Sequence, residues 1–224
     1  MAPTTVIAQT DSAYGGKTGV DFMAGKNHVG AFAHPRAVVC DTELLLSLPE
    51  RERACGMGEV IKYGVIAEPG ILDEVSRGFP GEELVARCVR IKCEYVSVDE
   101  FDTGVRRTLN FGHTAGHAFE AASGFTLSHG QAVAYGMLAE AKLGEALGVT
   151  SPEVFPAIEA ACEKAGLDTD FAPRMKAALP YLSRDKKSDG NATELVLPTR
   201  LGNTVMLRVS AEELKEGLMK AAEV

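Results

Sequence analysis

Three of the five histidines of this 224-residue chain lie close together, at positions 113, 117 and 129. His113 and His117 are four residues apart, so on a helix they would share one face. His129 follows a break at Ser123-Gly124 and would return from another element. Catalytic zinc commonly takes three protein ligands, often two histidines and a glutamate, and leaves one position open for substrate. Spacing alone favours His113 and His117 as a metal pair, but it leaves ordinary hydrogen-bonded histidines as an alternative.

A second candidate pair, Glu59 and Lys62, lies three residues apart in "ACGMGEVIKYG" and would share one helix face. The commonest fate of such a pair is a weak ion pair at the surface. Here the neighbouring residues are apolar nearly all round the helix, which is typical of a buried helix. Buried charges need partners or a metal. The pattern therefore favours a buried functional pair over a surface one.

Two glycine-rich segments near the N-terminus carry lysines that could bind an anion. "SAYGGKTG" ends like a phosphate loop, but Asp11 stands where that loop requires its first glycine. "AGKNHVG" places Lys26 and Asn27 between glycines, which can bring backbone N–H groups and a positive charge to an anion. A third basic segment, "RDKK" at residues 184–187, is by itself typical of a solvated loop. The two glycine-rich segments together suggest an anionic ligand.

Helical periodicity begins at Pro49, after a lead-in rich in turns. It predicts helices at about residues 50–67, 82–100, 111–122, 130–148, 152–165 and 211–222. Short strand patterns lie at Ala37–Cys40, Glu194–Leu197 and Val205–Val209. The expected fold class is therefore mainly α, with a short glycine-rich lead-in and small β elements. We expect residues 1–50 to form the lead-in and residues 51–224 the helical domain.

Composition excludes several classes of protein. Hydrophobic residues make up 46% and charged residues 24%, as in an ordinary globular protein. A net charge of −8 argues against a nucleic-acid partner. No apolar run is long enough for a membrane span, and the first residues lack the pattern of a signal peptide. Five cysteines without CxxC spacing predict reduced thiols in the cytoplasm.

Several longer segments, taken together, resemble the 3-dehydroquinate synthase family of the sugar-phosphate cyclase superfamily. They are "PTTVIAQTDSAYGGKTGVDFMAGKNHVGAF", "LPERERACGMGEVIKYG", "LNFGHTAGHAFEA", "SHGQAVAYGM" and "RDKK", and the match runs from Pro3 to about Pro198. Members of the family are phosphate-eliminating lyases of the shikimate pathway of aromatic amino acid biosynthesis. They convert 3-deoxy-D-arabino-heptulosonate 7-phosphate, a small phosphorylated keto acid, to 3-dehydroquinate. The resemblance implies NAD, a divalent metal (zinc first, cobalt second) and a homodimer.

The resemblance also implies roles for individual residues. The implied metal ligands are Glu59, His113 and His129, whereas His117 matches a position that contacts the substrate phosphate. Arg106 and Lys92 match positions near the substrate carboxylate. The catalytic and substrate-binding positions together are Asp11, Lys17, Asn27, Lys62, Lys92, Arg106, Asn110, His117 and Lys186. The NAD-contacting positions are Thr4, Thr5, Lys17, Lys26 and the segment from Leu44 to Ser47.

The sequence also departs from the family pattern. Asp21 stands where the family commonly has asparagine, Gln131 replaces the glutamate of "HGEAV", and Ala115 replaces a bulkier apolar residue. Family members carry a nucleotide-binding α/β domain, with a glycine-triplet loop, ahead of the segment that begins "PTT". We therefore expect a truncated or split synthase whose residues 1–50 are a remnant of that junction, with a separate nucleotide-binding chain as one partner. The alternatives are another sugar-phosphate cyclase, a related polyol dehydrogenase, or an inactive metal-binding fragment.

Overall fold

The computed structural model describes residues 1–22, 25–76, 80–184 and 192–223, and it is mainly helical. Its α-helices are α1 (Glu50–Ile66), α2 (Gly70–Ser76), α3 (Glu82–Val98), α4 (His113–Ala122), α5 (His129–Ala146), α6 (Val154–Lys164), α7 (Ala172–Ala178) and α8 (Ala211–Ala221). Shorter helical turns are η1 (Ala8–Ser12), η2 (Thr42–Ser47), η3 (Val105–Asn110) and η4 (Leu179–Arg184). The described strands form two antiparallel hairpins, β1 (Lys17–Phe22) with β2 (Gly25–Phe32) and β3 (Ala192–Arg200) with β4 (Asn203–Ser210).

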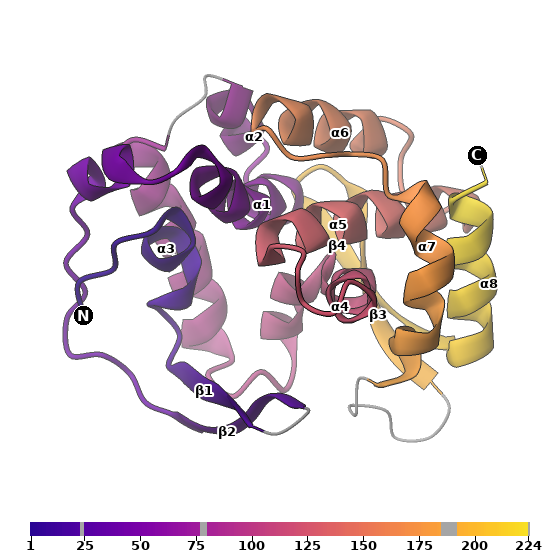
Figure 1. Cartoon of the computed structure of the whole chain (residues 1–224), viewed down its shortest axis with the longest axis horizontal. Coiled ribbons are helices and arrows are strands. Elements are labelled where there is room, and N and C mark those ends of the chain that lie inside the picture. The colour runs from indigo at the N-terminus through magenta and orange to yellow at the C-terminus, as the bar shows by residue number, and fades with distance from the viewer. Residues whose placement is uncertain (23–24, 77–79, 185–191, 224) are drawn as a thin grey trace.

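Helices α1 and α5 form the centre of the molecule (Figure 1). Residues 57–66 of α1 and residues 132–141 of α5 are all buried, on every face of each helix. A helix that is apolar nearly all round has no face to present to water, so it is surrounded by other elements. This explains why the charged residues within these two buried segments, Glu59, Lys62 and Glu140, are also buried.

Glycines let α1 and α5 pack backbone against backbone. A Cβ atom at Gly130 would lie 1.7 Å from the carbonyl oxygen of Cys55, and one at Gly58 would lie 2.5 Å from the carbonyl oxygen of Gly130. Both positions therefore require glycine. Because Gly58 precedes Glu59 and Gly130 follows His129, this contact also brings a carboxylate and an imidazole together.

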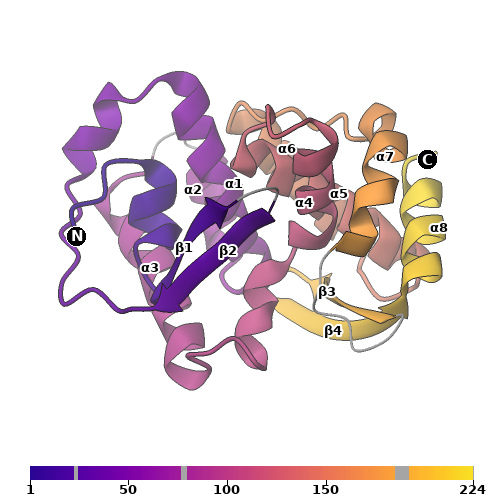
Figure 2. The same ribbon diagram turned by 60° about the horizontal axis from the view of Figure 1, so that its bottom comes forward.

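The remaining elements flank this centre on two sides (Figures 1 and 2). The hairpin β1–β2 and helix α3 lie on the side of the N-terminus, whereas β3–β4, α7 and α8 lie on the side of the C-terminus. The middle of β3, Leu195–Leu197, is buried. Helix α8 begins with a capping box in which the Ser210 hydroxyl accepts from the backbone N–H of Glu213.

The six predicted helices are confirmed, each to within two residues at either end, and the strands β3 and β4 are confirmed as longer than predicted. The predicted strand at Ala37–Cys40 is wrong. Its described backbone bonds run to the first residue of the chain, from the Val39 N–H to the Met1 carbonyl and from the terminal amine to the Ala37 carbonyl. One partner residue cannot form a ladder. The hairpin β1–β2 was not predicted, because glycines interrupt its alternation.

No helix among the described residues is both long and apolar enough to cross a membrane.

Candidate metal and anion-binding site

Three side chains converge where helices α1, α4 and α5 meet. Glu59 comes from the buried middle of α1, while His113 and His129 are the first residues of α4 and α5. Nε2 of His129 lies 2.9 Å from Oε1 of Glu59, and Nε2 of His113 lies 3.3 Å from the same oxygen. One ligand atom from each of the three residues lies within 4.8 Å of the others. The two imidazoles thus point at a single carboxylate oxygen.

The other ring nitrogen of each histidine is also held by an oxygen. Nδ1 of His113 lies 3.1 Å from the Phe111 carbonyl, and Nδ1 of His129 lies 3.0 Å from Oε1 of the buried Glu120. Metal-binding histidines usually donate their second N–H to a carbonyl or carboxylate, which fixes the tautomer and the ring orientation. Burial lowers the pKa of His129, but Glu120 and Glu59 outweigh it and raise that pKa to about 9. Two oriented imidazoles and one carboxylate fit a zinc ion.

Lys62 completes the environment of Glu59. Its ammonium donates to Oε2 of Glu59, whereas the two histidines face Oε1. The side chains of Lys62 and Glu59 are both almost fully buried. Burial raises the pKa of Glu59, but Lys62 and His113 outweigh burial and hold it well below its usual value. Burial lowers the pKa of Lys62, but Glu59 and Asp11 outweigh it, so that pKa is raised. The pair is therefore buried and charged, not a surface ion pair.

His117 lies beside this cluster on α4, but outside it. Its side chain is exposed, and its ring centre lies 5.4 Å from that of His113 and 6.4 Å from that of His129. Residue spacing favoured His113 and His117 as the pair. The structure instead groups Glu59, His113 and His129, which is the set that the resemblance implied.

A second group of charged residues lies next to the cluster, around Asp11. Nζ of Lys92 lies 2.9 Å from Oδ1 of Asp11 and donates to the Asp11 carbonyl at 2.7 Å. The hydroxyl of Tyr63, which follows Lys62 on α1, donates to the same carboxylate oxygen. Burial raises the pKa of Asp11, but Lys92, Lys62 and the Tyr63 hydroxyl together outweigh it and lower that pKa. Asp11 thus ties α3 and α1 to the N-terminal segment.

Arg106 and Lys17 bring further positive charge to this side. Arg106 is buried, and its guanidinium donates to the carbonyl oxygens of Gly15, at 2.7 Å, and of Glu100. Lys17, on β1, places its Nζ 2.6 Å from Oδ2 of the buried Asp102. Two cations that the resemblance assigned to substrate therefore lie at the loop that joins η1 to β1, Arg106 bonded to Gly15 within it and Lys17 directly after it.

The other predicted residues lie farther from the cluster or outside what the structure describes. Asn110 ends η3 and is partly exposed; Thr5 accepts the N–H of Ala8, and Thr4 is exposed. Leu44 and Ser47 are exposed residues of η2. The backbone of Lys26 and Asn27 belongs to β2, but their side chains lie outside the described part of the structure, as does all of Lys186.

Sequence reasoning missed four residues that organise the site: Tyr63, Asp102, Glu120 and Glu140. Glu120 carried the one usable signal, because it follows His117 by three residues in an otherwise apolar helix. Asp102 adopts the left-handed conformation, with φ of 59°, in a loop whose sequence does not predict it. Glu140 lies in a helix in which a glutamate would ordinarily be expected on the outer face.

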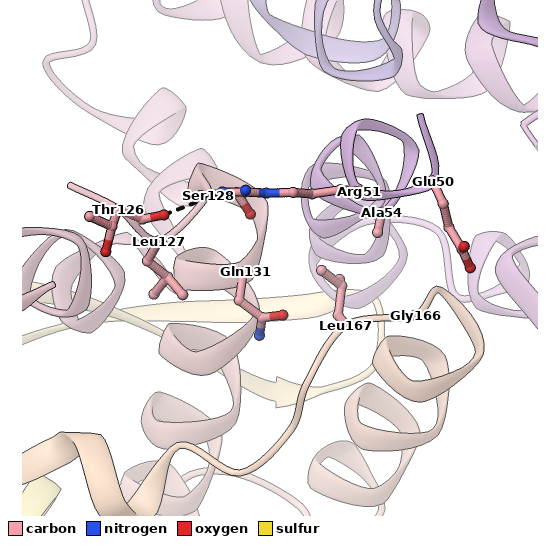
Figure 3. A pocket seen from close by; sticks show the side chains of 9 residues that line it. All are labelled: Glu50, Arg51, Ala54, Thr126, Leu127, Ser128, Gln131, Gly166 and Leu167. Atoms are coloured by element: carbon pink, nitrogen blue, oxygen red, sulfur yellow. Dashed lines mark hydrogen bonds between the residues drawn. The ribbon is translucent and has the colours of Figure 1, made fainter. Parts of the chain in front are cut away.

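A cavity of about 440 Å³ lies on the far side of the first turn of α5 (Figure 3). Ser128 and Gln131, which flank His129 in sequence, line it, and none of the three cluster residues does. The guanidinium of Arg51 crosses it and donates to the Thr126 carbonyl at 3.3 Å (Figure 3). This contact ties the first turn of α1 to the loop that leads into His129.

Comparison with known proteins agrees with this geometry. The profile described as "3-dehydroquinate synthase C-terminal" matches residues 56–188, and the one described as "3-dehydroquinate synthase N-terminal" matches residues 1–55. The 3-dehydroquinate synthase of Streptococcus sanguinis (strain SK36) is 42% identical over 228 residues, which cover 97% of this chain and 64% of the relative. That of Symbiobacterium thermophilum is 43% identical over 231 residues, with the same two coverages.

Solved structures share the fold. A crystal structure of 2-deoxy-scyllo-inosose synthase superposes with a TM-score of 0.83 at 26% identity, over 98% of this chain and 64% of that one. A second, complexed with carbaglucose-6-phosphate, NAD+ and Co2+, gives a TM-score of 0.84 at 25% identity, over 98% of this chain and 65% of that one. This chain therefore spans about 64% of the length of the relatives that it matches.

The C-terminal profile matches more than half of the chain and contains all three cluster residues. The chain belongs to the 3-dehydroquinate synthase family.

Proposed function

We propose that this chain forms the metal- and substrate-binding part of a 3-dehydroquinate synthase, which converts 3-deoxy-D-arabino-heptulosonate 7-phosphate to 3-dehydroquinate and phosphate. The observation that carries the proposal is the convergence of Nε2 of His113 and Nε2 of His129 on Oε1 of Glu59. Identity of 42–43% to synthases, but only 25–26% to the two 2-deoxy-scyllo-inosose synthase structures, supports the choice of substrate.

Glu59, His113 and His129 would hold the metal, zinc first and cobalt second. A bound metal would supply a Lewis acid for the substrate hydroxyls, and bound NAD would supply a hydride acceptor. The contribution of the chain itself is positioning and charge. Lys92 and Arg106 would orient the substrate carboxylate, while Asp11, which accepts from the Tyr63 hydroxyl, holds Lys92 in place.

The phosphate end of the substrate would meet the remaining polar groups. Lys17 and His117 are the exposed members of this set, and Asn110 is partly exposed at the end of η3. We assign Asn27 and Lys186 to the same end and Lys26 to NAD on the resemblance alone. Lys62 is buried against Glu59, so its role is to keep that carboxylate ionised and oriented.

A cyclase for carboxylate-free sugar phosphates is the second candidate, and the superposition on 2-deoxy-scyllo-inosose synthase favours it. Arg106 separates the two functions best, because its buried guanidinium donates to the neutral carbonyls of Gly15 and Glu100. A substrate carboxylate would give it a charged partner, whereas Lys92 already pairs with Asp11. Arg106→Lys loses the bidentate fork. In a complete protein that includes this chain, it should raise KM for the keto-acid phosphate about tenfold or more, since a charged hydrogen bond contributes about 1.5–3 kcal/mol. Steady-state kinetics checks this, and equal turnover of carboxylate-free sugar phosphates would favour the second candidate.

The activity would also need sequence that the relatives have and these 224 residues do not span. Met1, Val39, Leu44 and Leu46 are exposed apolar residues in or beside the predicted lead-in, residues 1–50. They suit a nucleotide-binding domain, supplied in the same chain or as a separate one, or a second copy in a homodimer. For the same reason we propose that the division between the lead-in and the helical domain lies near residue 50.

The purified 224-residue chain should therefore fold and bind zinc, yet bind NAD weakly and show no turnover. Calorimetry with NAD and a coupled assay of phosphate release would measure this, before and after a nucleotide-binding domain is added in trans. Full 3-dehydroquinate formation by the chain alone would contradict it and would leave the inactive-fragment alternative without support. All five cysteines are free thiols, which accords with the cytoplasmic location that we propose.

A further inference from the structure

The N-terminus of α4 is capped by a carboxylate from a different helix. The N-cap residue of α4 is Gly112, which has no side chain to accept the N–H groups of the first turn. Glu140 of α5 takes this role: Oε2 accepts the N–H of Gly112 at 2.7 Å, and Oε1 accepts the N–H of Ala115 at 2.9 Å. Both oxygens of a single carboxylate are therefore used on the backbone on either side of His113.

Local packing leaves little room for another arrangement. Gly112 has φ of 78°, and a Cβ there would lie 2.5 Å from Cγ of Met137. One turn before Glu140, a Cβ at Gly136 would lie 1.9 Å from the Gly112 carbonyl oxygen. The two helices approach this closely only because both positions are glycine, and the approach is what allows Glu140 to reach the first turn of α4.

Glu140 has no exposed surface. Burial raises its pKa to about 8, although the N–H groups of Ala115, Gly112 and Thr114 lower it. A buried carboxyl that is held by backbone donors is costly unless those bonds are kept. Its bonds also fall on the two sides of a candidate metal ligand, and Nδ1 of that ligand, His113, is already fixed by Phe111. The backbone and the ring of His113 are thus fixed separately.

We propose that Glu140 is the positioning residue for the metal centre, which sets the place of His113 relative to His129 by clamping the start of α4 onto α5. The inference rests on the proposed metal site, but it concerns a residue that touches neither metal nor substrate. The two helices hold each other's histidine: Glu120 of α4 orients His129 of α5, and Glu140 of α5 fixes the backbone around His113 of α4.

Glu140→Gln tests this at nearly constant volume. One amide oxygen can still accept a backbone N–H, but the amide nitrogen cannot, so one of the two bonds becomes a donor facing a donor. Zinc affinity of the 224-residue chain should fall about 10–100-fold, as is usual when an outer partner of a ligand is removed. Glu145→Gln is the matched control, because it makes the same change on α5 at a residue that lies 4.0 Å from the ammonium of Lys142 and away from the first turn of α4. Its zinc affinity should equal that of the wild type.

Three measurements separate positioning from stability. Zinc titration against a competing chelator at low temperature gives affinity, the visible spectrum of the Co2+-loaded chain reports ligand geometry, and thermal melting without metal reports the fold. A lower Tm for Glu140→Gln with unchanged zinc affinity and an unchanged Co2+ spectrum would reduce Glu140 to a structural residue. If the wild type binds no zinc, the proposed metal site is wrong, and this inference is wrong with it.

If Glu140→Gln does not fold, hydrogen exchange of the wild type still tests whether Glu140 clamps the start of α4. The amides of Gly112 and Ala115 should then exchange as slowly as the buried amides of α5, because they donate to a carboxylate with no exposed surface. Exchange at the rate of surface amides would overturn the clamp.

Discussion

The metal cluster and Lys17, one of the groups that would meet the substrate phosphate, are built in different ways. Glu59, His113 and His129 sit in the middle or at the first residue of long helices, which glycine contacts hold backbone to backbone. Lys17 sits on a two-stranded hairpin, with its side chain 47% exposed. The cluster is thus part of the core, whereas the group that would meet the substrate phosphate is on a surface element.

The contrast indicates which part of the site is organised before any ligand arrives. Atoms in the core are fixed by packing that the whole fold maintains, so the metal ligands need no substrate to converge. The half-exposed ammonium of Lys17 is held by the Asp102 carboxylate and can turn toward an anion without disturbing the core. Changes in the cluster should therefore alter both metal affinity and stability, and changes on the hairpin should alter mainly anion affinity.

The largest expected effect is a loss of zinc binding, and it should separate two neighbouring histidines, His129 and His117. His129→Ala removes a nitrogen 2.9 Å from Glu59 and should abolish stoichiometric zinc binding. His117→Ala removes an exposed ring outside the cluster, and zinc should stay at one ion per chain. Metal analysis of both proteins after dialysis would measure this. An equal loss of zinc from the two variants would show that the ligand assignment is wrong.

The sequence predicted the helices far better than it predicted this assignment. Periodicity identifies a helix such as α8 from its own residues, because its buried residues Leu214, Leu218 and Ala221 repeat along one face. The ligand set depends on Glu59, which lies on another helix and reaches the histidines only through the contact of Gly58 with Gly130. Spacing within "GHTAGH" could not reveal that contact. It pointed to His117, and only the resemblance to a family supplied Glu59 and His129.

The lead-in was the least predictable region, for a different physical reason. Gly19 and Gly30 face each other across β1 and β2, and a Cβ at Gly30 would lie 2.1 Å from the Thr18 carbonyl oxygen. Glycines in a strand remove the alternation on which strand prediction depends, so the hairpin looked like turns. Residues 23–24, which join the two strands in sequence, lie outside the described structure, as does Lys186.

A smaller effect is expected when the glycine contact beneath the cluster is filled. Gly130→Ala would place a methyl group 1.7 Å from the Cys55 carbonyl, so α1 and α5 must move apart. Overpacking of this kind costs about 1–3 kcal/mol, and the shift separates Glu59 from His129. Thermal denaturation and zinc titration should both show a loss. Gly81→Ala is the control, since a methyl group at that position would meet no described atom within 4 Å and its φ is −78°. A Gly130→Ala protein with wild-type Tm and zinc affinity would show that the helices do not need this contact.

The smallest effect on stability is expected on the hairpin. Lys17→Met removes an ion pair that is half-exposed at its ammonium but buried at Asp102, so the cost should lie between the about 0–1 kcal/mol of a surface pair and the about 3–5 kcal/mol of a broken buried pair. Lys62→Met makes the same chemical change inside the core and leaves Glu59 with a buried charge, which costs about 3–5 kcal/mol. Urea denaturation of the two variants measures the difference directly, and Lys176→Met, at an exposed position on α7, gives the baseline for losing a surface lysine.

Function should rank these lysines differently from stability. If Lys17 binds the phosphate end, Lys17→Met should weaken the binding of inorganic phosphate to the zinc-loaded chain, while Lys176→Met should not. A charge-assisted bond contributes about 1.5–3 kcal/mol, so the loss should be about tenfold or more. A Lys17→Met protein that loses several kcal/mol of stability, or that binds phosphate as well as Lys176→Met does, would remove the distinction between a core-built metal cluster and a surface anion site. The short distance from Lys17 to the buried Asp102 would then mark a structural ion pair that anchors the hairpin to the domain.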